Sequence, residues 1–330
     1  EVRTERKQWF MIYADHAATT KISETAKLAM LSAMEKDWYN PSSLYTPGQQ
    51  ASGTLMDARV RIARCLGCLP KEIYFTSGGS EADNQAILSA AAIGKRQGKM
   101  HIISTAFEHH AVLHTLKKLE KEGFEITLLD VGEKGIVSPA QVEKAIRPDT
   151  ALVTVMYANN EIGTIQPICE IGAVCRQKGV LFHTDAVQAA GHLPINVKDD
   201  QIDMLSLSAH KFNGPKGIGV LYAKTGVFLT NLIEGGGQER GKRAGTENLP
   251  AIVGMAAALE EALALQNERL VYVTQLRNQL IAGLKNIPDA ILNGDEKSRL
   301  PGNVNFCFKG TEAEGLLLLL DNKGICASSG

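Results

Sequence analysis

A lysine at the end of an apolar run is the residue of this chain best suited to covalent chemistry. Residues 206–219 read Ser-Leu-Ser-Ala-His-Lys-Phe-Asn-Gly-Pro-Lys-Gly-Ile-Gly, so a strand-like stretch ends in Lys211 and a glycine-rich turn. A lysine amine that is partly removed from water loses proton affinity and becomes a nucleophile able to form a Schiff base with a carbonyl group. Ser208 and His210 lie beside it as donors suited to a phosphate. Taken alone, the stretch fits a surface turn with a solvated lysine equally well.

Polar segments also follow two earlier strand-like runs. Residues 76–84 read Thr-Ser-Gly-Gly-Ser-Glu-Ala-Asp-Asn and lead into a helical pattern, whose first backbone N–H groups can bind a phosphate. Ser80 suits a helix N-cap as well, and the two roles can coexist. His109 follows the next run, where an imidazole can lie over a ring or move a proton. A lone histidine is more often structural or solvated, so its position at a strand end is what favours the functional interpretation.

Amides and a carboxylate follow two further runs. Asn159 and Asn160 suit hydrogen bonding to a phenolic or carbonyl oxygen, although Asn and Gly also build ordinary turns. Asp185 follows a buried run, where a carboxylate is costly unless it is paired, and a protonated heteroaromatic nitrogen is a suitable partner. The five segments together offer a Schiff-base lysine, a carboxylate, a histidine, amides and a phosphate cup. This combination is the one that pyridoxal phosphate requires.

The elements that must position these residues alternate between strand and helix patterns. The expected strands are at residues 72–75, 101–104, 125–131, 151–157, 180–183, 202–207 and 219–222. Most of the stretches between them have helical periodicity, which predicts βαβ units and an α/β fold with a mainly parallel sheet covered on both faces. Ligands of such sheets gather at the carboxyl ends of the strands, where the polar segments lie.

Composition limits the classes of partner. The chain has 330 residues, of which 44% are hydrophobic and 22% charged, so it can bury a large core and form one large domain plus a smaller one. Its formal net charge of -1 gives no reason to expect a nucleic-acid partner, and no apolar run is long enough to span a bilayer. We therefore expect small-molecule and protein partners, and neither a nucleic acid nor a membrane.

The cysteines predict a reducing compartment. The chain has 6 of them, at positions 65, 68, 169, 175, 307 and 326, which is not the spacing of a secreted disulfide framework. Cys65 and Cys68 form a C-x-x-C pair, but no second cysteine or histidine pair follows at zinc spacing. We expect two small packed residues at the end of a helix, no metal, and a cytoplasmic location.

A series of motifs identifies a family resemblance. The motifs are YADHAATT at 13–20, NPSS at 40–43, TSGGSE at 76–81, EH at 108–109, NNEIG at 159–163, HTDAVQ at 183–188, SAHK at 208–211 and RAGT at 243–246. In this order they closely resemble the cysteine desulfurases of NifS/IscS type, which belong to the aminotransferase class V group of fold-type I pyridoxal-phosphate enzymes. The resemblance extends from about residue 12 onward.

The resemblance implies a role for each candidate site residue. Lys211 would form the Schiff base, Asp185 would pair with the pyridine nitrogen, and His109 would stack on the ring. The remaining cofactor-binding positions are Gln188 at the ring hydroxyl, Asn160 near cofactor and substrate, Gly79, Ser80, Ser208 and His210 at the phosphate, and Thr246 at the phosphate of a neighbouring subunit. A homodimer with composite sites follows. Lys211 and His109 would be the catalytic residues, and Lys216, which lacks the preceding Ser-x-His, is expected to be structural.

The resemblance also divides the chain. Residues 1–20 would form an N-terminal arm that packs with the small domain, 21–255 the large cofactor-binding domain, and 256–330 a smaller α+β domain that is incomplete at its C-terminal end. The family continues past this point with Ser-Ala-Cys, whose cysteine is the nucleophile, so we expect these residues to be part of a longer protein. Cys326 aligns with a variable position upstream and is expected to be a small packed residue.

The implied activity is conversion of L-cysteine to L-alanine, with the sulfur passed to an enzyme cysteine as a persulfide. The sulfur would serve iron-sulfur clusters or another sulfur-containing product, through an acceptor or scaffold protein. Three alternatives remain open: a selenocysteine lyase, a class V aminotransferase, and a cofactor-binding protein without turnover if the chain ends at Gly330.

Overall fold

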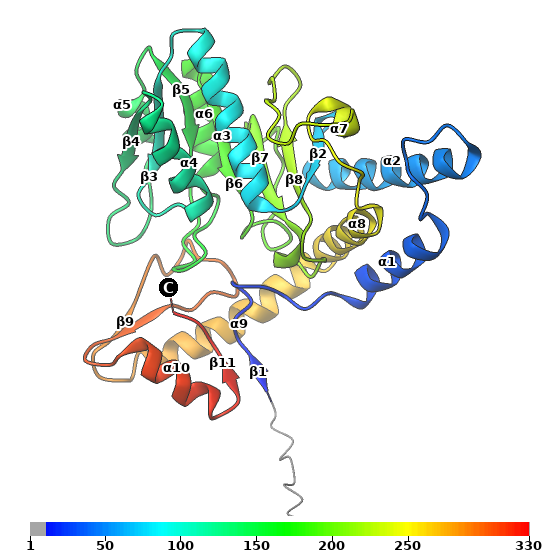
Figure 1. Cartoon of the computed structure of the whole chain (residues 1–330). Helices are drawn as coiled ribbons and strands as arrows, with labels where there is room; N and C mark the ends of the chain where they lie inside the picture. The colour runs from blue at the N-terminus through cyan, green and yellow to red at the C-terminus, as the bar shows by residue number, and fades with distance from the viewer. Residues whose placement is uncertain (1–10, 330) are drawn as a thin grey trace, which may run out of the picture.

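The computed structural model describes residues 11–329, and a seven-stranded sheet forms its centre (Figure 1). The strand order is β2-β8-β7-β6-β5-β3-β4. The strands are β2 (Ile73–Thr76), β3 (His101–Thr105), β4 (Glu125–Leu129), β5 (Thr150–Thr154), β6 (Leu181–Asp185), β7 (Met204–Ser208) and β8 (Gly219–Ala223). Neighbours from β4 to β7 run parallel, and β8 is antiparallel to both β2 and β7. The expected mainly parallel sheet is therefore confirmed.

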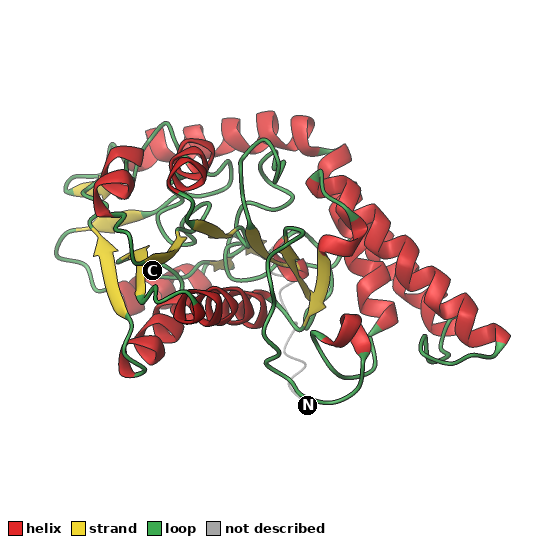
Figure 2. Ribbon diagram, turned by 90° about the horizontal axis from the view of Figure 1, so that it is seen from above, coloured by secondary structure: helices red, strands yellow, loops and turns green. Residues whose placement is uncertain are grey.

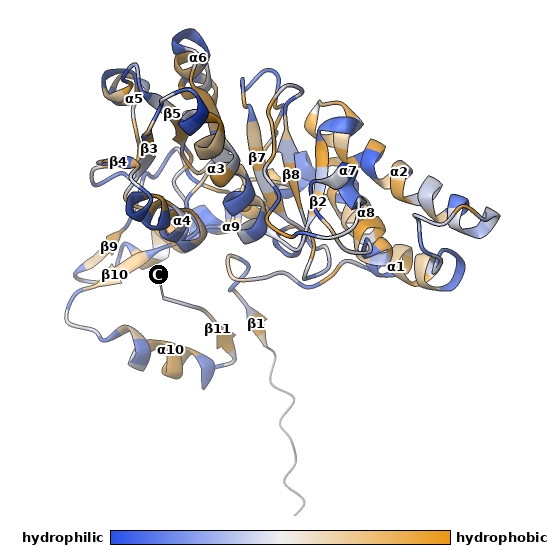
Figure 3. Ribbon diagram, turned by 45° about the horizontal axis from the view of Figure 1, so that its top comes forward, coloured by the Kyte–Doolittle hydropathy of each residue, from blue (hydrophilic) through white to orange (hydrophobic). Residues whose placement is uncertain are grey.

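Alternate residues of the strands enter two separate cores. Ile102, Leu152 and Met204 pack with the apolar faces of α3 (Gly79–Arg96) and α4 (His110–Lys121). Their neighbours along the strands belong to the core on the opposite face, namely Ile103, Val153 and Leu205. That core is completed by α1 (Glu24–Lys36), α2 (Thr46–Leu66), α5 (Pro139–Ala145), α6 (Ile168–Lys178) and α8 (Leu249–Ala264). Because successive side chains of a strand point to opposite faces, a strand buried on both sides is apolar throughout. Figure 3 shows apolar residues in the central strands, although β7 also carries Ser206 and Ser208. Figure 2 shows the two helical layers.

The C-terminal part forms a smaller body. It contains α9 (Gln266–Leu284), α10 (Ala313–Asp321) and an antiparallel pair of β9 (Ala290–Leu292) and β10 (Phe306–Phe308). The strand β1 (Ile12–Tyr13) pairs in parallel with β11 (Ile325–Cys326), so the start of the described chain lies against this body. Residues 1–10 of the expected arm lie outside the described residues.

Residues 249–284 form two helices in succession. The helices α8 and α9 meet at a bend of 69°, and α8 packs mainly on α1 and α2. The domain boundary expected at 255/256 lies inside α8, and the division into domains stays a proposal. Within residues 11–329 no single helix is long and apolar enough to cross a membrane, and only the bent pair α8–α9 reaches that length and composition.

A buried ion pair anchors the loop that carries Thr246. Arg59 lies in α2 and is 4% exposed. Glu239 lies in the short helix α7 (Gln238–Gly241) and is 5% exposed. The guanidinium donates to both carboxylate oxygens, at 2.5 and 2.8 Å, and Glu239 also accepts the N–H of Phe75 at 3.0 Å. These bonds compensate both buried charges and join the loop to β2, at the edge of the sheet.

Candidate active site

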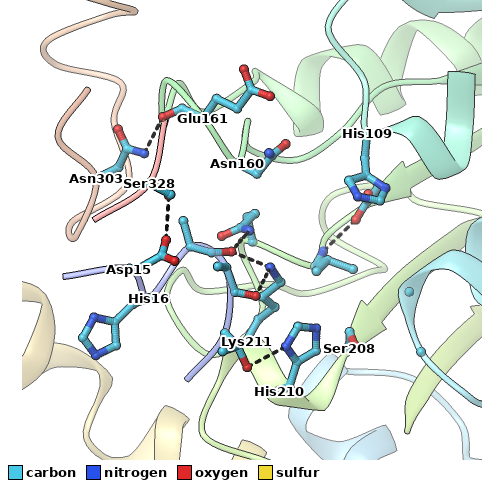
Figure 4. A pocket seen from close by; sticks show the side chains of 18 of the residues that line it. Asp15, His16, His109, Asn160, Glu161, Ser208, His210, Lys211, Asn303 and Ser328 are labelled. Carbon is cyan, nitrogen blue, oxygen red and sulfur yellow. Dashed lines mark hydrogen bonds between the residues drawn. The ribbon is translucent and has the colours of Figure 1, made fainter. Parts of the chain in front are cut away.

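A cavity of about 890 Å³ opens at the carboxyl ends of the parallel strands. Residues that follow β2, β3, β5, β6 and β7 all line it, as the five polar segments of the sequence predict. Nine of the ten candidate site residues border it: Gly79, Ser80, His109, Asn160, Asp185, Gln188, Ser208, His210 and Lys211. Figure 4 shows the close view, with the N-terminal segment 14–19 on one side.

Lys211 lies in a 3-10 turn, η2 (Ala209–Lys211), directly after β7. Its Nζ donates to the backbone carbonyl of Ala17 and, at 2.9 Å, to that of Ala18. Burial lowers the pKa of the Lys211 amine, and the negative charges of Asp185 and Asp15 act in the opposite direction. The lowered pKa is the property that the sequence analysis required of a nucleophilic lysine. Lys216 also borders the cavity, at its exposed edge.

The start of α3 forms the cup expected for a phosphate. Gly78 precedes the helix with φ of 155°, a conformation that side chains rarely adopt, and a Cβ on Gly79 would lie 2.6 Å from a methyl carbon of Val187. Glycine therefore lets the first turn approach the cavity, where its N–H groups and dipole favour an anion. Ser208 lies directly beside this turn, because its Oγ would be 3.6 Å from a Cβ on Gly78.

His210 is oriented by a neighbouring hydroxyl. Its Nδ1 lies 3.1 Å from Oγ1 of Thr19, so Nε2 is the nitrogen left for the cavity. Burial lowers the pKa of His210, and the nearby positive charges of Lys211 and Lys216 lower it further. A neutral imidazole at this position is a hydrogen-bonding group rather than a fixed charge.

Asp185, the last residue of β6, is 5% exposed. Its Oδ1 accepts the backbone N–H of Val187 at 2.9 Å. Burial raises the pKa of this carboxyl, and the Val187 N–H, His109 and Lys211 act against that rise. A buried carboxylate held at a cavity wall fits a protonated ring nitrogen.

His109 caps helix α4, and this sets its tautomer. Its Nδ1 accepts the backbone N–H of Ala111 at 3.1 Å, so the neutral ring carries its proton on Nε2. One ligand atom each of Asp83, His109 and Asp185 lies within 4.8 Å of the other two. The imidazole therefore lies next to the buried carboxylate at the cavity.

The two asparagines after β5 have different roles. Asn159 is buried, and its Oδ1 accepts the N–H groups of Glu161 and Ile162, both at 2.9 Å. It builds the turn, as the alternative interpretation expects, while Asn160 lines the cavity. On the opposite wall, the Gln188 amide nitrogen donates to the Ala17 carbonyl at 3.0 Å, which leaves its oxygen as the free acceptor.

Thr246 lies apart from the other candidates. It is exposed and borders a separate small cavity of about 60 Å³. Ser77 and Gly217 line both cavities, so the two adjoin at the phosphate end. Within this chain Thr246 does not join the nine residues around the main cavity.

The sequence analysis missed several residues of the site. Asp83 is a second carboxylate on the cavity wall, and Asp15 closes another side by accepting the Ser328 hydroxyl at 2.7 Å. Asn303 also borders the cavity and donates to the Glu161 carbonyl at 2.8 Å. Asp83 belongs to the segment after β2 and lies one helical turn beyond Gly79. Acidic residues are common near the start of a helix, so its residue type alone does not indicate a role in the site.

The donor set fits pyridoxal phosphate. The cup at Gly79 suits an anion, Asp185 suits a protonated ring nitrogen, and Lys211 offers an amine of lowered pKa to a carbonyl. None of the six cysteines, all within the described residues, borders the cavity. Cys65 and Cys68 lie at the C-terminal end of α2, where burial raises their pKa values to about 11 and about 12. They are therefore poor thiolates at neutral pH.

Comparison with known families and sequences is consistent with this chemistry. Residues 12–330 match the model of the aminotransferase class-V family. A protein of Clostridium botulinum named "Cysteine desulfurase IscS" is 52% identical over 322 residues, which cover 97% of this chain and 81% of that protein.

Two solved structures are also similar. A "NIFS-like protein" has a TM-score of 0.94 at 37% identity, covering 97% of this chain and 88% of that one. The structure titled "SspA in complex with cysteine" has a TM-score of 0.83 at 37% identity, covering 97% and 89%.

Proposed function

The chain belongs to the aminotransferase class V family and is a pyridoxal-phosphate-dependent cysteine desulfurase, and we propose that the nine residues around the cavity carry out its reaction. L-cysteine is converted to L-alanine, and its sulfur leaves as a persulfide on a protein thiol. The observation that carries the assignment of residues is the placement of Lys211, with its lowered pKa, and Asp185 on walls of one cavity.

The cofactor, when bound, supplies an electron-accepting ring and a carbonyl that reacts with amines. Gly79, Ser80, Ser208 and the Nε2 of His210 bind its phosphate, and the free amide oxygen of Gln188 accepts from its ring hydroxyl. Asp185 holds a proton on the ring nitrogen, and Asn160 binds beside cofactor and substrate. All of these residues line the cavity.

Two side chains, Lys211 and His109, transfer protons in the proposed reaction. Lys211 would hold the cofactor carbonyl through its Nζ, and the same amine, when free, would take the Cα proton of the substrate. The Nε2 of His109 exchanges the proton of the substrate thiol, because Nδ1 is occupied by the Ala111 N–H. Both proton carriers line the same cavity.

The sulfur passes to a thiolate. That thiolate forms the S–S bond as the substrate C–S bond breaks, and the carbon that loses sulfur is reprotonated to give alanine. We propose that the thiolate enters beside residues 327–329, which line the cavity.

The test of the function is product analysis of the holoprotein. With L-cysteine and a reductant, alanine and sulfide should form in equal amounts without a 2-oxo acid. Alanine from L-selenocysteine alone would make the protein a selenocysteine lyase, and dependence on a 2-oxo acid would make it an aminotransferase. Binding of the cofactor without alanine from either amino acid would contradict turnover altogether.

We also propose a homodimer. Thr246 is exposed on a loop next to the phosphate end of the cavity, where it can complete the site of a second chain. Helices α1 and α2 and the loop between them expose large apolar side chains, which two copies can bury: Leu28, Leu31, Met34, Trp38, Leu44, Tyr45, Met56 and Val60. Light scattering should report twice the chain mass, and a single-chain mass would contradict the proposal.

The sulfur acceptor is proposed to be a second protein, an acceptor or scaffold for iron-sulfur clusters or other sulfur-containing products. The six free cysteines and the net charge of -1 support a cytoplasmic enzyme without nucleic-acid partners. Cell fractionation that finds the protein outside the cytoplasm would contradict this location.

A further inference from the structure

Two buried acids near Asp185, one of them on the cavity wall, are not explained by the roles above. Asp83 of α3 is 1% exposed and Glu108, after β3, is 5% exposed, as is Asp185. Asp83 and Asp185 approach within 4.8 Å through one oxygen each. Two carboxylates this close, removed from water, cannot both be ionised without a large cost in free energy.

The surroundings of the two carboxyls differ. Asp185 receives the Val187 N–H and faces the positive charges of Lys211 and His109, all of which favour its ionised form. Asp83 accepts from the Ser206 hydroxyl and lies near the negative charges of Asp185 and Glu108. Burial therefore raises the pKa of Asp83 well above its usual value, and these two acids raise it further.

His183 does not supply a counter-charge to Asp83. Its Nε2 lies 3.7 Å from Oδ1 of Asp83, too far for a hydrogen bond. Both ring nitrogens are already paired, with the hydroxyls of Thr154 at 2.8 Å and Ser206 at 3.0 Å. Burial lowers the pKa of His183 to about 3, so the ring is neutral at physiological pH. Among residues 11–329, nothing forms a hydrogen bond with Oδ1 of Asp83, and a missing partner is far more costly for a charged oxygen than for a neutral acid.

Glu108 is a second acid of the same kind. Its Oε1 accepts the Thr105 hydroxyl at 2.7 Å and the Met156 N–H at 3.0 Å, while Oε2 is buried without a partner. Burial raises its pKa to about 8. Burial therefore raises the pKa of all three acids, so a full set of three negative charges is disfavoured.

We propose that Asp83 is a positioning residue, held as a neutral carboxylic acid, that confines the negative charge of the cluster to Asp185 at the cavity. It acts on the reaction through Asp185 and does not touch the reacting atoms. This inference rests on the proposed function, because the charge at Asp185 is what holds a proton on the cofactor ring nitrogen. A neutral Asp83 places no second negative charge beside Asp185, which keeps Asp185 a weaker base, so the proton stays on the ring.

The first test is infrared difference spectroscopy of the holoprotein, native minus Asp83→Asn. The expected result is loss of a protonated carboxylic acid C=O band, with no loss of a carboxylate band. Glu108→Gln is the matched control, because it should remove a separate acid band. Loss of a carboxylate band in Asp83→Asn would overturn the proposal. This measurement reports the protonation of Asp83 whether or not L-cysteine is the substrate, so its failure is distinct from a failure of the function.

The second test compares two substitutions at position 83. Asp83→Asn keeps a neutral polar group of the same shape beside Asp185, so kcat and cofactor affinity should stay within about threefold of native. Asp83→Leu replaces the polar group with an apolar one, which makes Asp185 more basic by desolvation, so kcat should fall at least about tenfold, and the pH midpoint of the cofactor's visible absorption should rise by about one unit. The midpoint rises because a more basic Asp185 takes a larger share of the ring proton. Equal behaviour of the two variants would overturn the proposal. If Asp83→Leu does not fold, the infrared result for Asp83→Asn decides.

Discussion

Lys211→Ala should abolish alanine release from L-cysteine, with kcat falling by about 10⁴-fold or more. The substitution removes the amine that holds the cofactor carbonyl and the base that takes the Cα proton, so two functions disappear together. Lys211 is half-buried, and its amine donates to the Ala17 and Ala18 carbonyls. The measurement is alanine production, with the intact mass after borohydride reduction as a second readout.

Lys216→Ala is the matched control. Lys216 has the same side chain, five residues along, at the exposed edge of the same cavity. Its variant should keep most of the activity and should gain the mass of the reduced cofactor after borohydride treatment, whereas Lys211→Ala should gain none. Covalent trapping in Lys211→Ala but not in Lys216→Ala would transfer the Schiff-base role to Lys216.

Asp185→Asn should lower kcat/KM by about 10³-fold. An amide has the shape of the carboxylate but no charge, so it cannot hold a proton on the ring nitrogen, and the ring becomes a poor acceptor of electrons. The fold itself should tolerate the change. Burial raises the pKa of Asp185, which means that the ionised form is disfavoured there without a partner. The melting temperature of the cofactor-free variant should therefore equal or exceed that of the native protein.

The same chemical change at Asp83 provides the contrast. The two carboxyls lie within 4.8 Å of each other, yet Asp83→Asn should have only a small effect. A kcat/KM for Asp185→Asn close to the native value would contradict the pairing of Asp185 with the ring nitrogen. Equal losses at both positions would show that the charge is shared between the two acids.

The strands and the order of the site segments could be predicted from the sequence. Each of the seven predicted strands overlaps an observed one, because a strand buried on both faces is a short apolar run that local sequence reveals. The polar residues that follow those runs meet at one edge because parallel strands end together. The end of β5 differs from the prediction: residues 155–157 are apolar but lie outside the strand. Their apolar character reflects burial beyond the strand end, which periodicity cannot distinguish from the strand itself.

Sequence by itself determined the fold class, the family and the residue types gathered at the strand ends, since these depend on local pattern and on motifs in order. Only the tertiary structure decided which Asn faces the cavity, which nitrogen of His109 carries the proton, and where Thr246 lies. It also brought Asp83, remote in the chain, against Asp185. The physical reason is that hydrogen-bond partners and the ionisation of buried acids depend on distance and burial, which arise from groups far apart in sequence.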